Sequence, residues 1–163
     1  MLLDLKKIIA VPGRVSFEYE PDISDMSFSS VVKWLSPLHA VGEVVNTAGA
    51  LTLTASLSVK MLCLCDRCGT EFEKDKLIPV EAKLAGDLED PDNPDIFPIA
   101  DDAVDLDEVL ITAFVLGMDT KFLCSEDCPG LCPKCGKPLK DGPCSCKKDI
   151  DPRLAVLGQL LEK

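Results

Sequence analysis

Nine cysteines, gathered in two short stretches, are the feature that most restricts how this chain of 163 residues can fold. Three lie within residues 63–68 and six within residues 124–146. We expect a cytoplasmic protein, because the N-terminal apolar stretch is short and carries an acid at Asp4, unlike a secretory signal. In a reducing compartment, clustered cysteines point to metal ligation or redox chemistry rather than to disulfides.

The second stretch alone contains enough thiols for a complete metal site. Cys132 and Cys135 are separated by two residues and followed by Gly136, a spacing that lets a tight turn aim two thiolates at one zinc ion. Cys144 and Cys146 follow shortly afterwards and offer the other two ligands. Four soft ligands within 15 residues predict one structural zinc site.

A second zinc site needs ligands from both stretches. Cys65 and Cys68 also have the two-residue spacing, and Cys124 and Cys128 are left to complete the set. The alternative, in which Cys124 and Cys128 pair with Cys144 and Cys146, stays open because spacing alone does not exclude it. Two zinc ions are therefore expected, and the eight predicted ligands are Cys65, Cys68, Cys124, Cys128, Cys132, Cys135, Cys144 and Cys146. Cys63 continues the apolar alternation of the preceding residues and is expected to be a buried free thiol.

Alternating apolar and polar residues predict a sheet upstream of the cysteines. The alternation is clearest over residues 51–61, and similar β-like runs occupy 14–20, 39–46 and 71–84, with a hairpin turn at 47–50. A helix is predicted over 105–118, capped by Asp105, and another from Asp151 to residue 161. The expected fold class is α+β: an antiparallel β-sheet or meander with a helix, and a C-terminal zinc module ending in a short helix.

These elements suggest two domains. Residues 1–120 are expected to form the β-rich domain, with an acidic loop at 84–104 and the helix at 105–118. Residues 121–163 are expected to form a cysteine-rich zinc module that docks on that domain through Cys65 and Cys68.

The formal net charge of −11 comes from one part of the chain. Residues 84–120 contain eleven acidic residues and no basic residue, whereas the rest is nearly neutral. This stretch is either a solvated loop or a surface for a basic partner, and it would repel nucleic-acid phosphates. The candidate acidic contacts are Asp87, Glu89, Asp90, Asp92 and Asp95. The candidate basic contacts near RNA are Lys134, Lys137, Lys140 and Arg153.

Several of these motifs occur together in a known family. Cys65-Asp66-Arg67-Cys68 after a strand, Val104-Asp105-Leu106 opening a helix, the run from Cys124 to Gly136, Cys144-Ser145-Cys146, and Asp151-Pro152-Arg153-Leu154 resemble the YceD family of large ribosomal RNA subunit accumulation proteins. The resemblance covers about residues 15–161. It implies a bacterial, cytoplasmic, non-enzymatic factor needed for processing or accumulation of the large-subunit ribosomal RNA.

The function expected is an assembly adaptor that supports 23S ribosomal RNA accumulation by contacting a ribosomal protein, the large-subunit RNA, or both. Two filled zinc sites would each add two negative charges and bring the chain to about −15, which argues against strong RNA binding by the protein alone. The alternative is a redox-responsive zinc protein with chaperone-like activity. An enzyme is not expected, because four cysteine ligands leave no open metal position. No membrane contact and no small-molecule substrate are expected.

Overall fold

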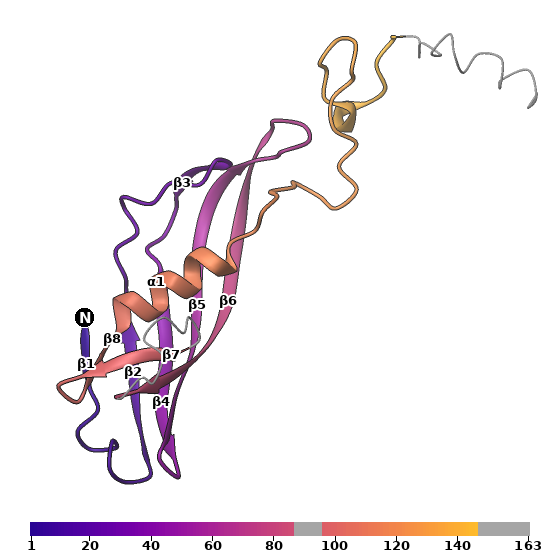
Figure 1. Ribbon diagram of the computed structural model, residues 1–163. Coiled ribbons are helices and arrows are strands. Elements are labelled where there is room, and N and C mark those ends of the chain that lie inside the picture. Colours follow the sequence, from indigo (N-terminus) through magenta and orange to yellow (C-terminus); the bar gives the residue numbers. More distant parts are fainter. Residues whose placement is uncertain (87–95, 147–163) are drawn as a thin grey trace, which may run out of the picture.

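The computed structural model describes residues 1–86 and 96–146, which form a strongly curled, mostly β sheet with one α-helix lying across it (Figure 1). The strands are β1 (Leu2–Asp4), β2 (Gly13–Tyr19), β3 (Val31–Trp34), β4 (His39–Thr47), β5 (Ala50–Leu64), β6 (Glu71–Ala85), β7 (Ile96–Ala100) and β8 (Ala103–Asp105). The helices are α1 (Leu106–Gly117) and the short 3-10 helix η1 (Leu139–Asp141). Within the described ranges, no helix is long and apolar enough to cross a membrane.

The sheet has the strand order β1-β8-β7-β6-β5-β4-β2. Its two longest strands, β5 and β6, form a hairpin of 15 residues per strand in the middle of the strand order. Because β5 is so long, β4 pairs with it only as far as Ser58, and β3 pairs with its far end near Met61. All pairs are antiparallel except β6 with β7, which run parallel.

The turn between β4 and β5 shows why that hairpin forms. Ala48 and Gly49 both have positive φ angles, 53° and 92°, as a two-residue turn matched to the strand twist requires. The side-chain oxygen of Asn46 accepts a hydrogen bond from the N–H of Gly49 at 2.8 Å. The predicted hairpin turn at 47–50 is confirmed.

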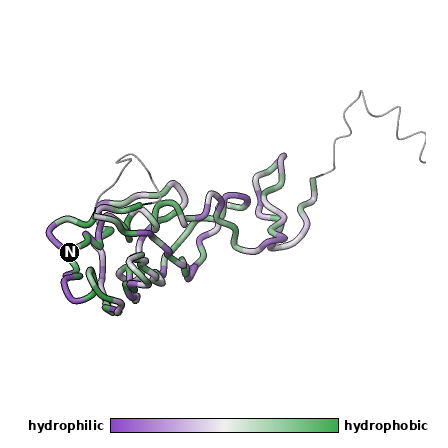
Figure 2. The backbone as a smooth tube through the Cα atoms, turned by 60° about the horizontal axis from the view of Figure 1, so that its bottom comes forward, coloured by the Kyte–Doolittle hydropathy of each residue, from purple (hydrophilic) through white to green (hydrophobic). Residues whose placement is uncertain are grey.

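One face of α1 packs on the concave side of the sheet and forms the core. Leu106, Leu110 and Phe114 are fully buried on that face. The Phe114 ring lies 6.0 Å from the ring of Phe28 and 5.7 Å from that of Trp34, measured between centroids. Burial of such a side chain is worth several kcal/mol. Hydrophobic stretches are spread along the strands of this body, and the cysteine-rich segment projects beyond it (Figure 2).

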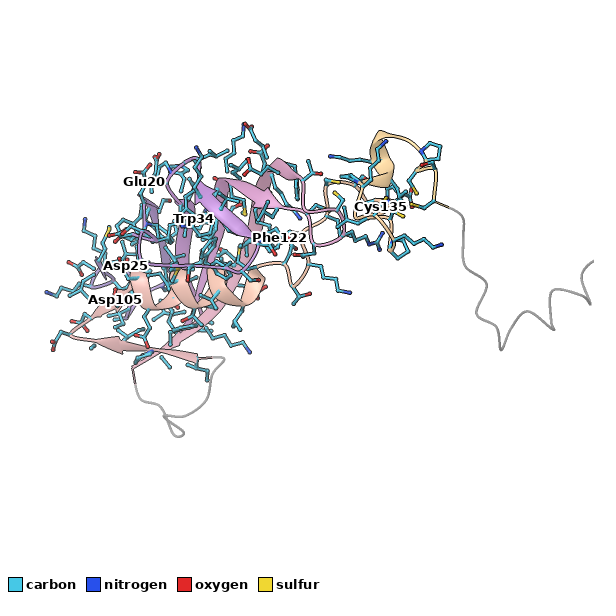
Figure 3. The ribbon with its side chains drawn as sticks, turned by 90° about the horizontal axis from the view of Figure 1, so that it is seen from above. Glu20, Asp25, Trp34, Asp105, Phe122 and Cys135 are labelled. Atoms are coloured by element: carbon cyan, nitrogen blue, oxygen red, sulfur yellow. The ribbon has the colours of Figure 1, made fainter. Side chains whose placement is uncertain are left out.

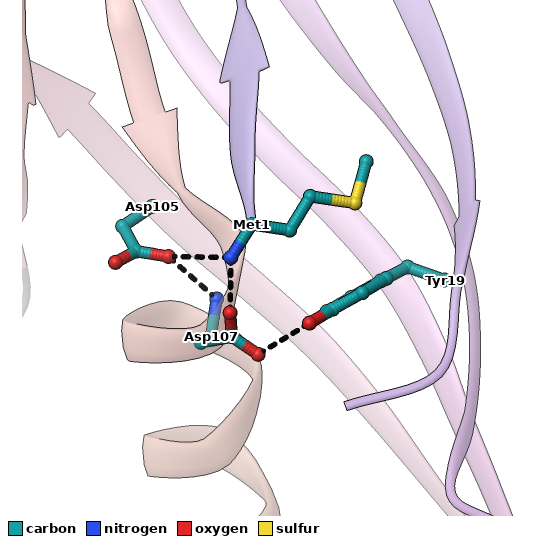
Figure 4. A network of polar contacts seen from close by, with 4 residues as sticks. All are labelled: Met1, Tyr19, Asp105 and Asp107. Atoms are coloured by element: carbon teal, nitrogen blue, oxygen red, sulfur yellow. Dashed lines mark hydrogen bonds and ion pairs between the residues drawn. The ribbon is translucent and has the colours of Figure 1, made fainter. Parts of the chain in front are cut away.

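A polar network fastens the start of α1 to the sheet (Figure 4). The Asp105 side chain caps the helix by accepting a hydrogen bond from the N–H of Asp107 at 3.0 Å. The Tyr19 hydroxyl donates to the Asp107 carboxylate at 2.8 Å, which raises the pKa of Tyr19 to about 12. The Met1 amino group contacts both carboxylates. The network therefore joins β1, β2 and α1.

The predicted fold class is wrong, although its main strands are right. The runs at 14–20, 39–46 and 71–84 correspond to β2, β4 and β6, and the helix predicted from Asp105 corresponds to α1. The protein is nevertheless mostly β, with a mixed rather than antiparallel sheet. Part of the predicted acidic loop forms β7 and β8, which are too short to show an alternation. The helix predicted from Asp151 lies outside the described residues.

Candidate metal centres

The structure gathers eight of the nine cysteines into two groups of four. The inner cluster is defined as Cys65, Cys68, Cys124 and Cys128, and the outer cluster as Cys132, Cys135, Cys144 and Cys146. Within each cluster the four Sγ atoms all lie within 4.8 Å of one another.

The sulfur positions fit a tetrahedral metal ion. Four thiolates at about 2.3 Å from a common centre would be about 3.8 Å apart. In the inner cluster the Cys65–Cys128 and Cys68–Cys124 Sγ distances are both 3.7 Å. In the outer cluster Cys132 and Cys144 approach to 3.3 Å. Each cluster can therefore hold one metal ion with four soft sulfur ligands and no other protein ligand.

The first half of the inner cluster is a knuckle at the tip of the β5–β6 hairpin. The Cys65 N–H donates to the Thr70 carbonyl at 2.9 Å, and the Gly69 N–H donates back to the Cys65 carbonyl at 2.8 Å. Gly69 has a φ of 66°, a conformation that glycine adopts without steric cost. The turn therefore points two thiols to the same side of the hairpin tip.

Backbone amides in this knuckle favour a thiolate at Cys65. Burial alone would raise its pKa, but the N–H groups of Cys124, Arg67 and Cys68 point at the sulfur and lower the pKa to about 6. The hydroxyl oxygen of Thr70 lies 3.3 Å from the Cys68 Sγ and lowers the pKa of that thiol. A metal ligand must be deprotonated, so both effects assist metal binding.

The first half of the outer cluster repeats this geometry. The Cys132 N–H donates to the Lys137 carbonyl at 2.9 Å, and the Gly136 N–H donates to the Cys132 carbonyl at 2.9 Å. Gly136 has a φ of 71°. The N–H groups of Cys135 and Lys134 lower the pKa of Cys132 to about 6.

The other thiols in both clusters ionise less readily without a cation. Burial raises the pKa of Cys124 to about 12. A hydrogen bond with Cys135 raises that of Cys146 to about 12. Four thiols this close cannot all be ionised unless a positive charge lies among them. The donor set therefore matches a divalent metal ion better than four free thiols.

Asp66, between the two knuckle cysteines, ties the inner cluster to the segment that follows α1. Its N–H donates to the Phe122 carbonyl at 2.8 Å, and its carboxylate accepts from the Phe122 N–H at 2.6 Å. The other carboxylate oxygen accepts from the Ser30 hydroxyl. The Ser30 bond, followed by the Phe122 bond, lowers the pKa of Asp66.

Arg67 adds a second clamp beside Asp66. Its guanidinium donates to the carbonyl oxygens of Glu126 and Cys128 at 3.2 and 3.1 Å. Gly130 has a φ of 75°, and a Cβ there would lie 3.2 Å from the Arg67 carbonyl oxygen. The second pair of inner cysteines is thus held against the first pair by backbone contacts.

The sequence predicted the cysteines of both clusters but not this support. The predicted partition of Cys65 and Cys68 with Cys124 and Cys128 is the one that the structure brings together. Cys63 lies outside both clusters and is buried, and burial raises its pKa. Asp66 and Arg67 lie inside a cysteine motif, which is a local signal, but nothing in the sequence links them to residues 122–128.

The candidate partner contacts are only partly covered by the described residues. Lys134, Lys137 and Lys140 are exposed in and after the outer knuckle. Arg153 and the acidic residues lie outside the described ranges; those acids are Asp87, Glu89, Asp90, Asp92 and Asp95.

Comparison with known proteins places this cysteine-bearing sheet in a family. A family model described as "Large ribosomal RNA subunit accumulation protein YceD" matches residues 53–161, which include most of β5, all of β6 and α1, and all eight clustered cysteines. The chain belongs to the YceD family. The description of this family names accumulation of the large ribosomal RNA subunit.

Mycobacterial proteins are among the relatives of this YceD-family chain. An uncharacterized protein of Mycobacterium tuberculosis is 41% identical over 63 residues, which make up 39% of this chain and 30% of the relative. A Mycobacterium bovis protein gives the same values. An uncharacterized Mycobacterium leprae protein is 24% identical over 139 residues, 80% of this chain and 62% of the relative. The match thus spans less than a third of the length of the first two relatives. No solved structure matches the chain.

Proposed function

We propose that this YceD-family protein is a non-enzymatic, zinc-containing adaptor in assembly of the large ribosomal subunit, where it supports 23S ribosomal RNA accumulation. The observation that carries the proposal is the family match over residues 53–161, because the family is named for accumulation of the large-subunit RNA. The structure contributes two candidate metal centres, of which the inner one fastens a projecting segment to the folded body and the outer one lies within that segment.

Zinc is the metal that best suits the two clusters. Four thiolates without a carboxylate or imidazole are a soft donor set, and structural zinc takes four such ligands in a tetrahedron. Zinc held in this way has no open position for water or substrate. Its role would be to hold the knuckles and the segments between them in place, which supports an adaptor rather than an enzyme.

The distribution of charge supports contacts at two ends of the molecule. Glu20, Asp25 and Asp105 lie toward the end opposite Cys135 (Figure 3). Exposed lysines, including Lys137, accompany the outer cluster. An acidic end suits a basic ribosomal protein, and lysines near a projecting module suit RNA phosphates. Because the filled centres add negative charge, RNA contact would depend on the protein partner.

Complementation in cells tests the adaptor. In a strain depleted of this protein, the wild-type chain should restore 23S RNA and large-subunit levels. A variant in which Asp87, Glu89, Asp90, Asp92 and Asp95 become amides should co-sediment with ribosomal particles less than the wild type does. The matched control neutralises Glu18 and Glu71, which are exposed on β2 and β6. Normal 23S RNA in the depleted strain would overturn the proposal.

A second candidate is a redox-responsive zinc protein, and the exposure of Cys135 in the outer cluster favours it. Peroxide reacts with accessible thiolates, and their oxidation would release the metal. Zinc release by peroxide that is coupled to capture of an unfolded client protein would support this candidate over the adaptor. Zinc release without client binding would count against it.

A further inference from the structure

The edge of β6 that faces away from β5 is largely unpaired. β5 pairs with β6 from Glu71 to Leu84, but on the other side β7 pairs only with Lys83–Ala85. Within the described parts of the chain, no other strand or backbone hydrogen bond covers the stretch 71–82 on that side. An unpaired edge of this length is a template for another strand.

Pro79 shows which residues present their backbone to that edge. Proline has no N–H, so within a sheet it occupies positions whose N–H would point away from the neighbouring strand. Pro79 lies opposite Ser56 of β5, which places its missing donor on the open side. Because the pattern repeats every second residue, the N–H and C=O groups of Leu77 and Glu81 also face the open edge.

A groove runs beside this edge, between β6 and α1. It has a volume of about 420 Å³, and apolar side chains line it from both elements, among them Val80, Ala82, Val109, Ala113 and Leu116. α1 approaches β6 so closely that a Cβ on Gly117 would lie 2.5 Å from the Cγ2 atom of Ile78. One side of the groove is therefore formed by β6 and the other by α1.

The outer surface of α1 is unusually apolar for a helix exposed to solvent. Leu116 is 80% exposed and Val115 46%, and Leu77 on β6 is 70% exposed. A surface helix normally has polar residues on its exposed face, whereas the last turn of α1 has Val115 and Leu116 there. These residues therefore indicate that something packs on this part of the molecule.

We propose that an extended, basic peptide segment of a protein partner binds here as an added strand along β6. Its backbone would bond to Leu77 and Glu81, and every second side chain would enter the apolar groove against Leu116. The remaining side chains would lie beside the exposed acids of the outer face of β6, including Asp75 and Glu81. Opposite charges across neighbouring strands favour lysine or arginine there.

The charges and Pro79 argue for a basic partner rather than a second copy. The outer face of β6 presents four exposed acids and one exposed lysine, namely Glu71, Glu73, Asp75, Glu81 and Lys83. Two copies joined by their β6 edges would bring together two prolines, and both would lack donors. A net-negative chain would also repel its own copy. The partner's identity as a ribosomal protein rests on the proposed function.

A defined peptide tests the edge directly. The probe is a fluorescein-labelled peptide of five Lys-Val repeats, added to the full-length, zinc-loaded protein. Its control is the same peptide with every backbone amide N-methylated, which keeps the charge but removes the donors that would pair with β6 in either strand direction. The unmodified peptide should bind at least tenfold more tightly, and hydrogen exchange should slow at the amides of Leu77 and Glu81. Equal binding of both peptides would overturn the proposal.

Matched variants separate backbone pairing, charge and apolar contact. Glu81→Pro removes an edge donor without touching the β5 ladder, so the affinity should fall at least tenfold, whereas Glu81→Gln should cost only a few-fold. Leu116→Asp should also weaken binding, whereas Val41→Asp, at an exposed site on β4, should not. Unfolding curves that match the wild type establish that each variant is folded. Wild-type affinity in Glu81→Pro would contradict the proposal.

A photocrosslinker in place of Leu77 identifies the occupant in cells, with one in place of Val41 as the control. The expected product joins position 77 to a basic large-subunit protein; a second copy or RNA would contradict it. The outcome is separable from the proposed function. If Glu81→Pro loses the peptide but restores 23S RNA, the adaptor stands and this groove is not its contact. If the wild-type chain does not restore 23S RNA, the adaptor fails whatever the peptide does.

Discussion

The inner and outer clusters begin with the same knuckle but have different surroundings. In both, the first cysteine receives and donates the same two backbone hydrogen bonds, and a glycine with positive φ follows the second cysteine. The inner cluster, however, joins segments about 60 residues apart, and Cys65, Cys68 and Cys128 are at most 4% exposed. The outer cluster is closed within 15 residues, with Cys135 exposed.

The difference shows that a short motif can set the ligand geometry while its surroundings decide what the metal does for the fold. Restricting the unfolded chain by a link across about 60 residues is worth roughly 4 kcal/mol, against about 3 kcal/mol for a 15-residue loop. More importantly, the inner link connects the sheet to the segment after α1, whereas the outer link connects only that segment to itself. The inner centre should therefore stabilise the whole molecule and the outer centre only its own module.

The largest expected effect is from removing one inner ligand. Cys68→Ser should lower the zinc content by at least one ion and the free energy of unfolding by at least about 4 kcal/mol, because the link is lost and the buried thiols of Cys65 and Cys128 stay without a metal. Cys135→Ser should also cost one ion but should change the unfolding of the sheet by less than about 1 kcal/mol. Zinc analysis and urea unfolding followed by Trp34 fluorescence measure both. Equal losses of stability would contradict the division between the clusters.

The two clusters should lose zinc to a chelator at different rates. With excess chelator, the outer zinc should leave at least about tenfold faster than the inner zinc, because Cys135 is exposed whereas three of the four inner thiols are buried. A chromogenic zinc indicator should record two phases of equal amplitude. Cys135→Ser identifies them, since it should abolish the fast phase and leave the slow one. A single phase in the wild type would mean that burial does not control metal release.

Asp66 supports the inner cluster alone, so its removal should affect that cluster selectively. Asp66→Asn should lower the free energy of unfolding, because an amide cannot accept from both Ser30 and Phe122 with the strength of a carboxylate. The slow zinc phase should become faster while the fast phase stays unchanged. Asp127→Asn, at an exposed position, is the matched control and should change neither.

The Asp66 carboxylate should also make the stability of the protein depend on pH. The folded-state pKa of Asp66 is lower than its ordinary value. Its contribution is therefore fully present above the ordinary aspartate pKa and is lost as pH falls through the lowered value. The stability difference between wild type and Asp66→Asn should be constant near neutral pH and should shrink in acid. A difference that grows on acidification would have the wrong sign for this assignment.

The two clusters also show which parts of the molecule follow from the sequence. The ligands follow from local spacing, as at Cys132 and Cys135, and the alternation around Leu57 predicts a strand of the sheet. The bond between Asp66 and Phe122 joins residues 56 apart, and no periodicity records it. β7 and β8 are also set by their neighbours rather than by their own pattern. The α+β prediction failed because it gave that interval to a loop.

The smallest expected effect comes from the two knuckle glycines, which form a matched pair. Gly69 and Gly136 have φ angles of 66° and 71°, and a Cβ would meet no atom within 4 Å at either. Alanine should therefore cost about 1–2 kcal/mol of backbone strain at both. Gly69→Ala should appear as lower stability of the sheet in urea, whereas Gly136→Ala should appear only as faster release of the outer zinc. Because the two substitutions are alike, any difference between the variants reflects the surroundings of the two clusters. Identical unfolding curves would mean that the outer cluster is coupled to the sheet as tightly as the inner cluster.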